Sequence, residues 1–248
     1  MILLLDVGNT TTHVALSSTR RILERAEFPT TLWKRARVPQ LLAAFLFGHT
    51  VTGVSYCLVV PGVLPAVCRF IRTRKYDSAQ VTATSVSGLK FKYRQLRTLG
   101  ADRVARVLAA TRLHGSPVVC VAFGTALTIE VVDAKGRFIG GIIAPGIGAF
   151  RDYLHEKTAQ LPAISLRPVS RFIGRGTEEA MRIGCVRGFH GMVSALIRGV
   201  REELGTEALV VATGGYARLA AAKVAEINTV HPDLTLEGLR LFWNERAR

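Results

Sequence analysis

The chain has 248 residues, 49% of them hydrophobic, so it can bury a full core as one large domain or as two lobes. Its longest apolar runs, 41–47 and 1–5, are far shorter than the roughly 20 residues that cross a bilayer. The start also lacks a basic segment and a cleavage site, so we expect a cytoplasmic protein that makes no membrane contact.

A strong excess of basic residues distinguishes the composition. The chain carries 33 Lys and Arg against 18 Asp and Glu, a net charge of +15, which favours anionic partners without choosing among them. No aromatic-interleaved RNA-binding signature or helix-turn-helix pattern accompanies this charge. We therefore favour solvated arginine-rich faces over a nucleic-acid site.

Four cysteines, Cys57, Cys68, Cys120 and Cys185, are scattered through apolar segments and form no C-x-x-C pair. The spacing suggests neither a zinc site nor a disulfide framework. We expect reduced cysteines in the core.

Strand and helix patterns alternate along the chain, which predicts the α/β class. The expected strands are 1–6, 11–17, 53–60, 79–84, 117–122, 126–133, 137–143 and 208–213. Helices are expected in the gaps, and the clearest is 177–204, where apolar residues recur every three or four positions. Two further helices are expected after the last strand, the second being "LTLEGLRLFWNER".

An internal repeat organises these elements. "LLLDVGNTTTHVAL" and "VVCVAFGTALTIEV" align strand on strand and Gly8 on Gly124. The repeat predicts two lobes of related topology, 1–115 and 116–248. A cleft between two such lobes would suit a nucleotide.

The turn of the first copy has the residues of a phosphate site. Gly8 can bring backbone N–H groups close to a phosphate, and Asn9, Thr10 and Thr11 add donors. Asp6 could hold a magnesium ion, which prefers one or two carboxylates plus substrate oxygens. An ordinary hairpin turn explains this motif alone equally well.

A second motif places Asp102 and Arg103 after Gly100, at the start of a helix expected over 103–114. Asp102 could act as a general base and Arg103 as an anion clamp. The alternative is a helix N-cap followed by an arginine on a solvated face, and it would be preferred for an isolated Asp-Arg pair.

Two glycine-rich turns complete the set, each weak evidence by itself. Segment 140–146, "GGIIAPG", joins paired glycines to a Pro-Gly turn before a helix, and 210–217, "VVATGGYA", reads as strand, turn and helix. The second turn suits close approach of an adenosine over bare backbone.

In this order the motifs closely resemble the type III pantothenate kinases, which belong to the sugar kinase, Hsp70 and actin superfamily. The resemblance runs from Leu4 to about Leu241. It implies a duplicated actin-like, ribonuclease H-like fold and a homodimer. It also implies transfer of the ATP γ-phosphate to the 4′-hydroxyl of pantothenate, the first step of coenzyme A synthesis, with Mg²⁺ and a monovalent cation, K⁺ or NH₄⁺.

The resemblance also assigns residues to roles. Asp102 matches the general base and Asp6 the magnesium and phosphate position. The phosphate loops and the adenosine turn correspond to Gly8, Asn9, Thr10, Gly124, Thr125, Thr213, Gly214 and Gly215. The pantothenate pocket corresponds to Tyr93, Gly100 and Arg103, together with Thr177, which in the family reaches pantothenate bound to the other protomer.

The chain departs from the family pattern at several of these motifs. The second phosphate loop of the family reads Asp-x-Gly-Thr-Ala, whereas this chain has Ala122 in place of the acid. Gln95-Leu96 replaces an Asn-Pro, and Gly176 replaces the Asn before Thr177. Glu130 follows on the next strand, but its register decides where it points, so we do not expect it to replace the acid.

Three hypotheses remain, in order of preference. The first is an active pantothenate kinase that tolerates Ala122 and uses ATP. The second is a non-catalytic subunit that pairs with an intact paralogue and donates Thr177 to its site. The third is a nucleic-acid-binding regulator, suggested by the net charge of +15, whose binding would weaken steeply with salt.

Overall fold

The computed structural model describes residues 1–35 and 37–246. The chain forms two compact units. The first unit combines Met1–Gly115 with Asp233–Arg248, and the second is Ser116–Pro232. The segment 233–248 therefore belongs to the first unit, whereas the repeat predicts that all of 116–248 forms the second lobe. The reason is its last helix, which packs on elements of the first unit.

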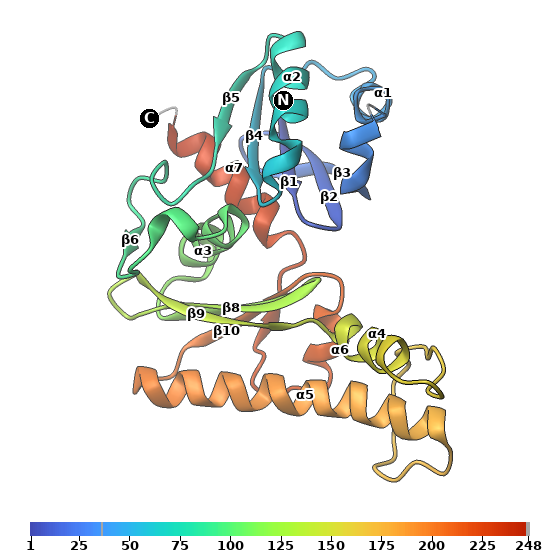
Figure 1. The fold of residues 1–248 in the computed structure, drawn as a ribbon. Helices are drawn as coiled ribbons and strands as arrows, with labels where there is room; N and C mark the ends of the chain where they lie inside the picture. Colours follow the sequence, from blue (N-terminus) through green and yellow to red (C-terminus); the bar gives the residue numbers. More distant parts are fainter. Residues whose placement is uncertain (36, 247–248) are drawn as a thin grey trace. The chain divides into compact units, whose positions relative to one another are not determined.

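The first unit contains a mixed five-stranded sheet in the order β3-β2-β1-β4-β5 (Figure 1). Its strands are β1 (Ile2–Val7), β2 (Thr11–Ser17), β3 (Ile22–Pro29), β4 (Gly53–Leu58) and β5 (Asp77–Gln80). β2 pairs antiparallel with both β1 and β3, whereas β4 runs parallel to β1 and to β5.

Strand β3 corrects the sequence prediction, which left its residues in a gap assigned to helix. Its sequence, "ILERAEFP", buries only Ile22 and Phe28, so its own apolar pattern is weak. Pairing along β2 satisfies its backbone groups, and this tertiary contact outweighs the helix propensity of the Leu, Glu and Arg residues. The strand expected at 79–84 is also displaced, because β5 ends at Gln80.

Helices cover both faces of this sheet. The helical segments are η1 (Thr30–Arg35), α1 (Val38–Phe45), η2 (Pro61–Val63), α2 (Leu64–Thr73), η3 (Leu96–Thr98), α3 (Ala101–His114) and α7 (Leu234–Arg246). A short strand, β6 (Lys90–Phe91), lies between α2 and η3 in the chain. α1 and α2 enclose the main core with Trp33 of η1 and one face of the strands. α3 and α7 pack on each other and against β1 and β4. The expected closing helix "LTLEGLRLFWNER" is confirmed as α7.

The second unit repeats this topology. Its strands β7 (Val118–Phe123), β8 (Ala126–Val132), β9 (Arg137–Pro145), β10 (Leu209–Thr213) and β11 (Thr229–Val230) follow the order β9-β8-β7-β10-β11. β7 and β8 pair antiparallel, and β10 runs parallel to β7, as β4 does to β1. The matching strand orders show that the sequence repeat is a duplication of the fold.

A long helix supports the second sheet. α5 (Thr177–Leu204) follows α4 (Ile147–Lys157) and precedes the short α6 (Ala217–Ala221). Its predicted boundaries are confirmed, including the stop at Gly205, which adopts the left-handed conformation with φ 63°. Figure 1 shows α5 lying along the sheet, and Phe189, Val193 and Ile197 enter the core. None of the helices in the described part of the chain could cross a membrane.

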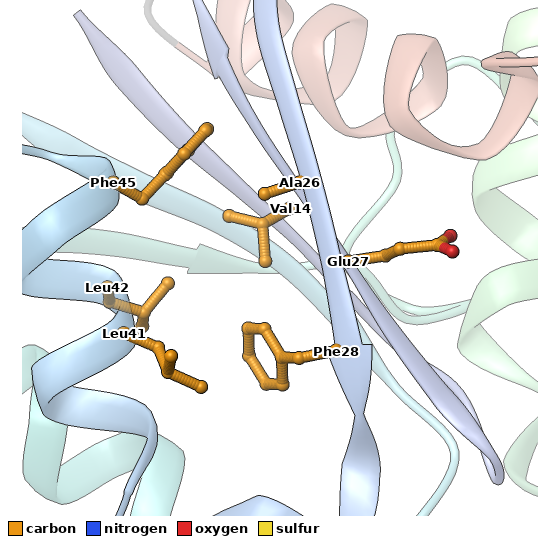
Figure 2. A pocket seen from close by; sticks show the side chains of 7 residues that line it. All are labelled: Val14, Ala26, Glu27, Phe28, Leu41, Leu42 and Phe45. Atoms are coloured by element: carbon orange, nitrogen blue, oxygen red, sulfur yellow. The ribbon is translucent and has the colours of Figure 1, made fainter.

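An apolar cavity of about 120 Å³ lies under α1 in the first unit. Figure 2 shows that the side chains gathered around it are apolar, whereas Glu27 points away from them on the other side of its strand. Glu27 instead pairs with His13, 3.2 Å away. The cavity is lined by Val14, Ala26, Phe28, Leu41, Leu42 and Phe45 besides Glu27. It offers little for the binding of phosphate or sugar groups, so we place the site elsewhere.

The contact between α3 and α7 depends on a glycine. A methyl group at Gly238 would overlap the carbonyl oxygen of Ala105 in α3. We expect Gly238→Ala to lower the free energy of unfolding by about 3 kcal/mol, the upper part of the range for overpacking. Urea unfolding followed by circular dichroism measures the change.

Gly199→Ala in α5 is the matched control, because no atom outside the helix lies within 4 Å of a methyl group there. It should be neutral or stabilising by up to about 1 kcal/mol, the helix propensity of Ala over Gly. Equal effects of the two substitutions would contradict this account of the α3–α7 contact.

Candidate active site

Asp6 lies near the end of β1 and pairs in register with Cys57 of β4. The Cys57 thiol donates a hydrogen bond to Asp6 Oδ1 at 3.2 Å. Burial and the negative charge of Asp102 raise the pKa of Asp6, opposed more weakly by His13, by the Cys57 hydrogen bond and by Arg106. Burial, followed by the Asp6 charge, raises the pKa of Cys57 well above its usual value, so the thiol remains a neutral donor.

Cys57 is therefore more than the core residue that the sequence suggested. Its thiol is buried and forms no disulfide with another described residue, as is the case for Cys120 and Cys185, while Cys68 is partly buried. The sequence offered no sign of its contact with Asp6, because the two residues are 51 positions apart. Only the parallel pairing of β1 with β4 brings them together.

The start of α3 differs from the N-cap alternative. Gly100 occupies the N-cap position, and Asp102 lies inside the first turn. A methyl group at Gly100 would lie 2.7 Å from Asp102 Oδ1, so the absence of a side chain leaves room for this carboxylate. Arg106 Nη1 donates to the other oxygen, Oδ2, at 3.0 Å.

Two arginines of α3 are buried, which corrects the solvated-face alternative for Arg103. Arg103 is 7% exposed and Arg106 is 6% exposed. We did not identify Arg106 from the sequence. Its spacing of four residues after Asp102 was the available signal, because side chains at i and i+4 meet on one helix face.

The first phosphate turn joins β1 to β2. The Gly8 N–H donates to the carbonyl of Thr11 at 3.1 Å, and a methyl group at Gly8 would lie 2.9 Å from that oxygen. Asn9 and Thr10 are exposed at its tip. The turn therefore presents bare backbone and polar side chains to solvent, close to Asp6 in the sequence.

A network of hydroxyl groups supports this turn from below. Thr30 Oγ1 donates to the Gly8 carbonyl at 2.7 Å and lies 3.0 Å from Thr12 Oγ1. The indole N–H of Trp33 donates to Thr12 Oγ1 at 3.1 Å. These buried groups fix the turn to the core, and the sequence did not reveal them.

The second phosphate turn, Gly124 and Thr125, is exposed between β7 and β8. As in the first copy, the glycine N–H donates to the carbonyl of the first residue of the next strand, here Ala126 at 3.1 Å. Gly146 packs against this turn so closely that a methyl group would overlap the carbonyl oxygens of Gly124 and Thr125.

The expected adenosine turn follows β10 and lies beside the second phosphate turn. Gly214 has φ 92°, and a methyl group there would overlap the carbonyl oxygen of Phe123 at the end of β7. The Thr213 hydroxyl is buried and donates to the carbonyl of Pro232 at 3.1 Å, whereas Gly215 is exposed. The two glycines, rather than the Thr213 hydroxyl, form the open part of this turn.

Ala122 occupies the position equivalent to Asp6 in the duplicated fold. In the first unit, Asp6 pairs in register with His13 and Cys57. In the second unit, Ala122 pairs with Thr128 and Thr213 and is 8% exposed. The second copy keeps the turn but not the charge.

Within the second unit, Thr177 lies far along α5 from the residues that pack beside the turn at Gly124. Thr177 is exposed at the start of α5, twelve positions before Phe189. The Phe189 ring lies 6.2 Å from the ring of Phe123 and 6.0 Å from that of Tyr216. Twelve helical residues span about 18 Å, which is the length of α5 between Thr177 and Phe189.

Tyr93 is partly buried between β6 and η3 in the first unit.

Asp6 suits a divalent cation such as Mg²⁺. Its Oδ1 accepts a hydrogen bond from the Cys57 thiol, and this bond orients the carboxylate. Asp102 adds a second negative charge nearby. Magnesium ions take one or two carboxylates together with substrate phosphates and water rather than an all-protein cage. This fits the finding that no cluster of three metal-binding side chains occurs among residues 1–35 and 37–246.

Because the pKa of Asp6 is raised in the folded state, its ionisation opposes folding. The penalty is absent below pH 3.8, the usual pKa of Asp, and is complete above the raised pKa of the folded state. We expect Asp6→Asn to increase the free energy of unfolding at pH 7, with the gain disappearing in acid. Urea unfolding at both pH values, without added metal, measures this.

Asp152→Asn is the control. The Asp152 carboxyl is exposed, and the hydrogen bond that it accepts from Arg151 lowers its pKa. This substitution should not stabilise the protein at pH 7. An Asp6→Asn protein that is less stable than the wild type at pH 7 would contradict our account of the carboxylates.

Comparisons with known proteins identify the family that the sequence motifs resemble. A family model described as type III pantothenate kinase matches residues 2–199. A type III pantothenate kinase of Roseiflexus castenholzii is 38% identical over 252 residues, covering 98% of both chains. One from Akkermansia muciniphila is 39% identical over 240 residues, covering 96% of both.

Solved structures support the fold. The ethanolamine utilization protein EutJ of Carboxydothermus hydrogenoformans has a TM-score of 0.61 at 14% identity, covering 97% of this chain and 89% of that chain. The ROK hexokinase of Thermus thermophilus has a TM-score of 0.51 at 13% identity, covering 97% of each. The expected α/β fold, a duplicated actin-like architecture, is confirmed. The chain belongs to the type III pantothenate kinase family.

Proposed function

We propose that this protein transfers the γ-phosphate of ATP to the 4′-hydroxyl of pantothenate. One observation supports this most strongly. Asp6, beside the first phosphate turn, and Asp102, the expected base, lie close enough for the charge of one to raise the pKa of the other. Relatives named as type III pantothenate kinases match over nearly the whole chain, which favours the kinase over a non-catalytic subunit or a nucleic-acid-binding regulator.

In this proposal Asp102 accepts the proton of the pantothenate hydroxyl. The hydroxyl oxygen forms a bond to the γ-phosphorus as the bond to the ADP oxygen breaks. Arg103 binds the pantothenate carboxylate, and Tyr93 lines the same pocket with Gly100. The Arg103 side chain is buried and therefore already ordered. It consequently loses little conformational entropy when it binds an anion.

The glycine turns would bind the nucleotide. Gly8, Asn9 and Thr10 bind phosphate in one copy, and Gly124 and Thr125 in the other. The bare backbone of Gly214 and Gly215, after Thr213, would receive the adenosine. The exposure of Gly124, Gly214 and Gly215 supports this assignment. Gly8 and Gly214 also pack so closely on neighbouring carbonyls that neither position has room for a side chain.

Asp6 would hold Mg²⁺, which neutralises charge on the phosphate oxygens when bound. We extend the proposal to a monovalent cation, K⁺ or NH₄⁺, which the family resemblance implies. The Ala122 methyl group supplies no ligand for this cation.

We also propose a homodimer in the cytoplasm, with a heteromer with a paralogue as the alternative assembly. Thr177 would reach pantothenate bound to the partner. Phe172 and Ile173, just before α5, are 76% and 80% exposed. Two large exposed apolar side chains beside Thr177 support a contact with another protomer.

The proposed reaction predicts ADP release that depends on pantothenate. The purified protein should release ADP only with pantothenate and Mg²⁺, and K⁺ or NH₄⁺ should support more activity than Na⁺. Asp102→Asn should lower kcat by about a hundred- to ten-thousand-fold, the usual effect of a proton-transfer group. A coupled ADP assay and mass spectrometry of the product measure both.

Arg218→Ala is a control for the loss of an exposed charge and should leave kcat unchanged, because Arg218 is exposed on α6. Release of ADP at the same rate without pantothenate would refute the proposed substrate. Full activity of Asp102→Asn would instead refute the role of Asp102.

Ala122 allows a second test, which concerns the residues proposed to bind the nucleotide. Ala122→Asp places a carboxylate between Thr128 and Thr213, in the position equivalent to Asp6. If the missing acid limits turnover, the variant should release ADP faster than the wild type. Ala122→Asn is the matched control of similar size without the charge, and an equal gain from both variants would exclude a role for the negative charge.

A further inference from the structure

Helix α3 buries a guanidinium beside the two acids of the candidate site. Arg106 Nη1 donates to Asp102 Oδ2 at 3.0 Å, and only 7% of the Arg106 side chain is exposed. The same group lowers the pKa of Asp6 and of the Cys57 thiol, so its charge acts on both strands of the site. None of the roles assigned above includes Arg106.

The charge of Arg106 also acts on Asp6, whose pKa it lowers, whereas the charge of Asp102 raises it. Since Arg106 donates a hydrogen bond to Asp102 as well, one guanidinium interacts with both acids.

The geometry also orients Asp102. Arg106 occupies Oδ2, while Oδ1 lies over Gly100, where a methyl group would be 2.7 Å away. The two carboxylate oxygens therefore have different environments. Since Arg106 holds Oδ2, Oδ1 is the oxygen assigned to face a substrate hydroxyl.

We propose that Arg106 is a positioning residue, which holds Asp102 by one carboxylate oxygen. This inference rests on the proposed function, because it assigns Asp102 Oδ1 as the proton acceptor. Arg103, one residue after Asp102, faces the substrate in this account, whereas Arg106 acts through Asp102.

Arg106→Ala tests the positioning role. We expect kcat to fall on the order of a hundredfold, the usual effect of misplacing a reacting group, with KM for pantothenate and for ATP changed less than about threefold. Added guanidinium at low concentration should restore part of kcat, and urea at the same concentration should not. Arg106→Lys should retain more activity than Arg106→Ala.

Arg112→Ala is the matched control on the same helix, because it removes an ion pair with Glu245 of α7. It should keep the wild-type kcat. Loss of kcat in both variants, or an Arg106→Ala protein with unchanged kcat, would overturn the positioning role. A loss confined to KM would do the same.

A stability cycle tests the ion pair of Arg106 with Asp102 without using activity. Arg106→Ala should lower the urea midpoint, and adding Asp102→Asn should raise the midpoint of this variant more than Asp102→Asn changes the wild type. Additive effects would overturn the proposal. Absence of turnover by the wild type would refute the proposed function instead, and the cycle would then decide by itself whether Arg106 holds Asp102.

Discussion

The burial of the Asp6 carboxyl near Asp102 is the constraint on which the candidate site in the first unit depends. Asp6 lies one residue before the end of the buried strand β1, and Asp102 lies in the first turn of α3, which packs on β4 of the same sheet. Burial and mutual repulsion both raise the pKa of Asp6, so the ionised pair costs free energy that packing elsewhere must offset. Cys57 and Arg106 reduce that cost by donating hydrogen bonds to one acid each.

The apolar contacts of the first unit provide the opposing free energy. α3 is held in place by α7, where the missing side chain of Gly238 permits close approach to Ala105. Because α7 lies at the far end of the chain, the last residues of the sequence help to position Asp102 near its middle. The buried hydroxyl groups of Thr12 and Thr30 have the same effect on the first phosphate turn.

The duplication is symmetric in backbone and asymmetric in charge. Both copies place a turn glycine after the first strand and donate its N–H to the start of the second. Only the first copy has an acid, Asp6, at the strand end, because the second has Ala122. The two copies therefore differ in electrostatics while sharing the turn geometry.

Local periodicity and turn residues already indicate the α/β class, the repeat, the glycine turns and the boundaries of α5. The strand at residues 22–29, the place of α7 in the first unit and the contact of Cys57 with Asp6 follow from the tertiary structure alone. The spacing of Arg106 four residues after Asp102 is visible in the sequence, but the burial of this ion pair is not. Parallel pairing of β1 with β4 and the close packing of α3 on α7 join residues that are distant in sequence, and the local pattern carries no record of such contacts.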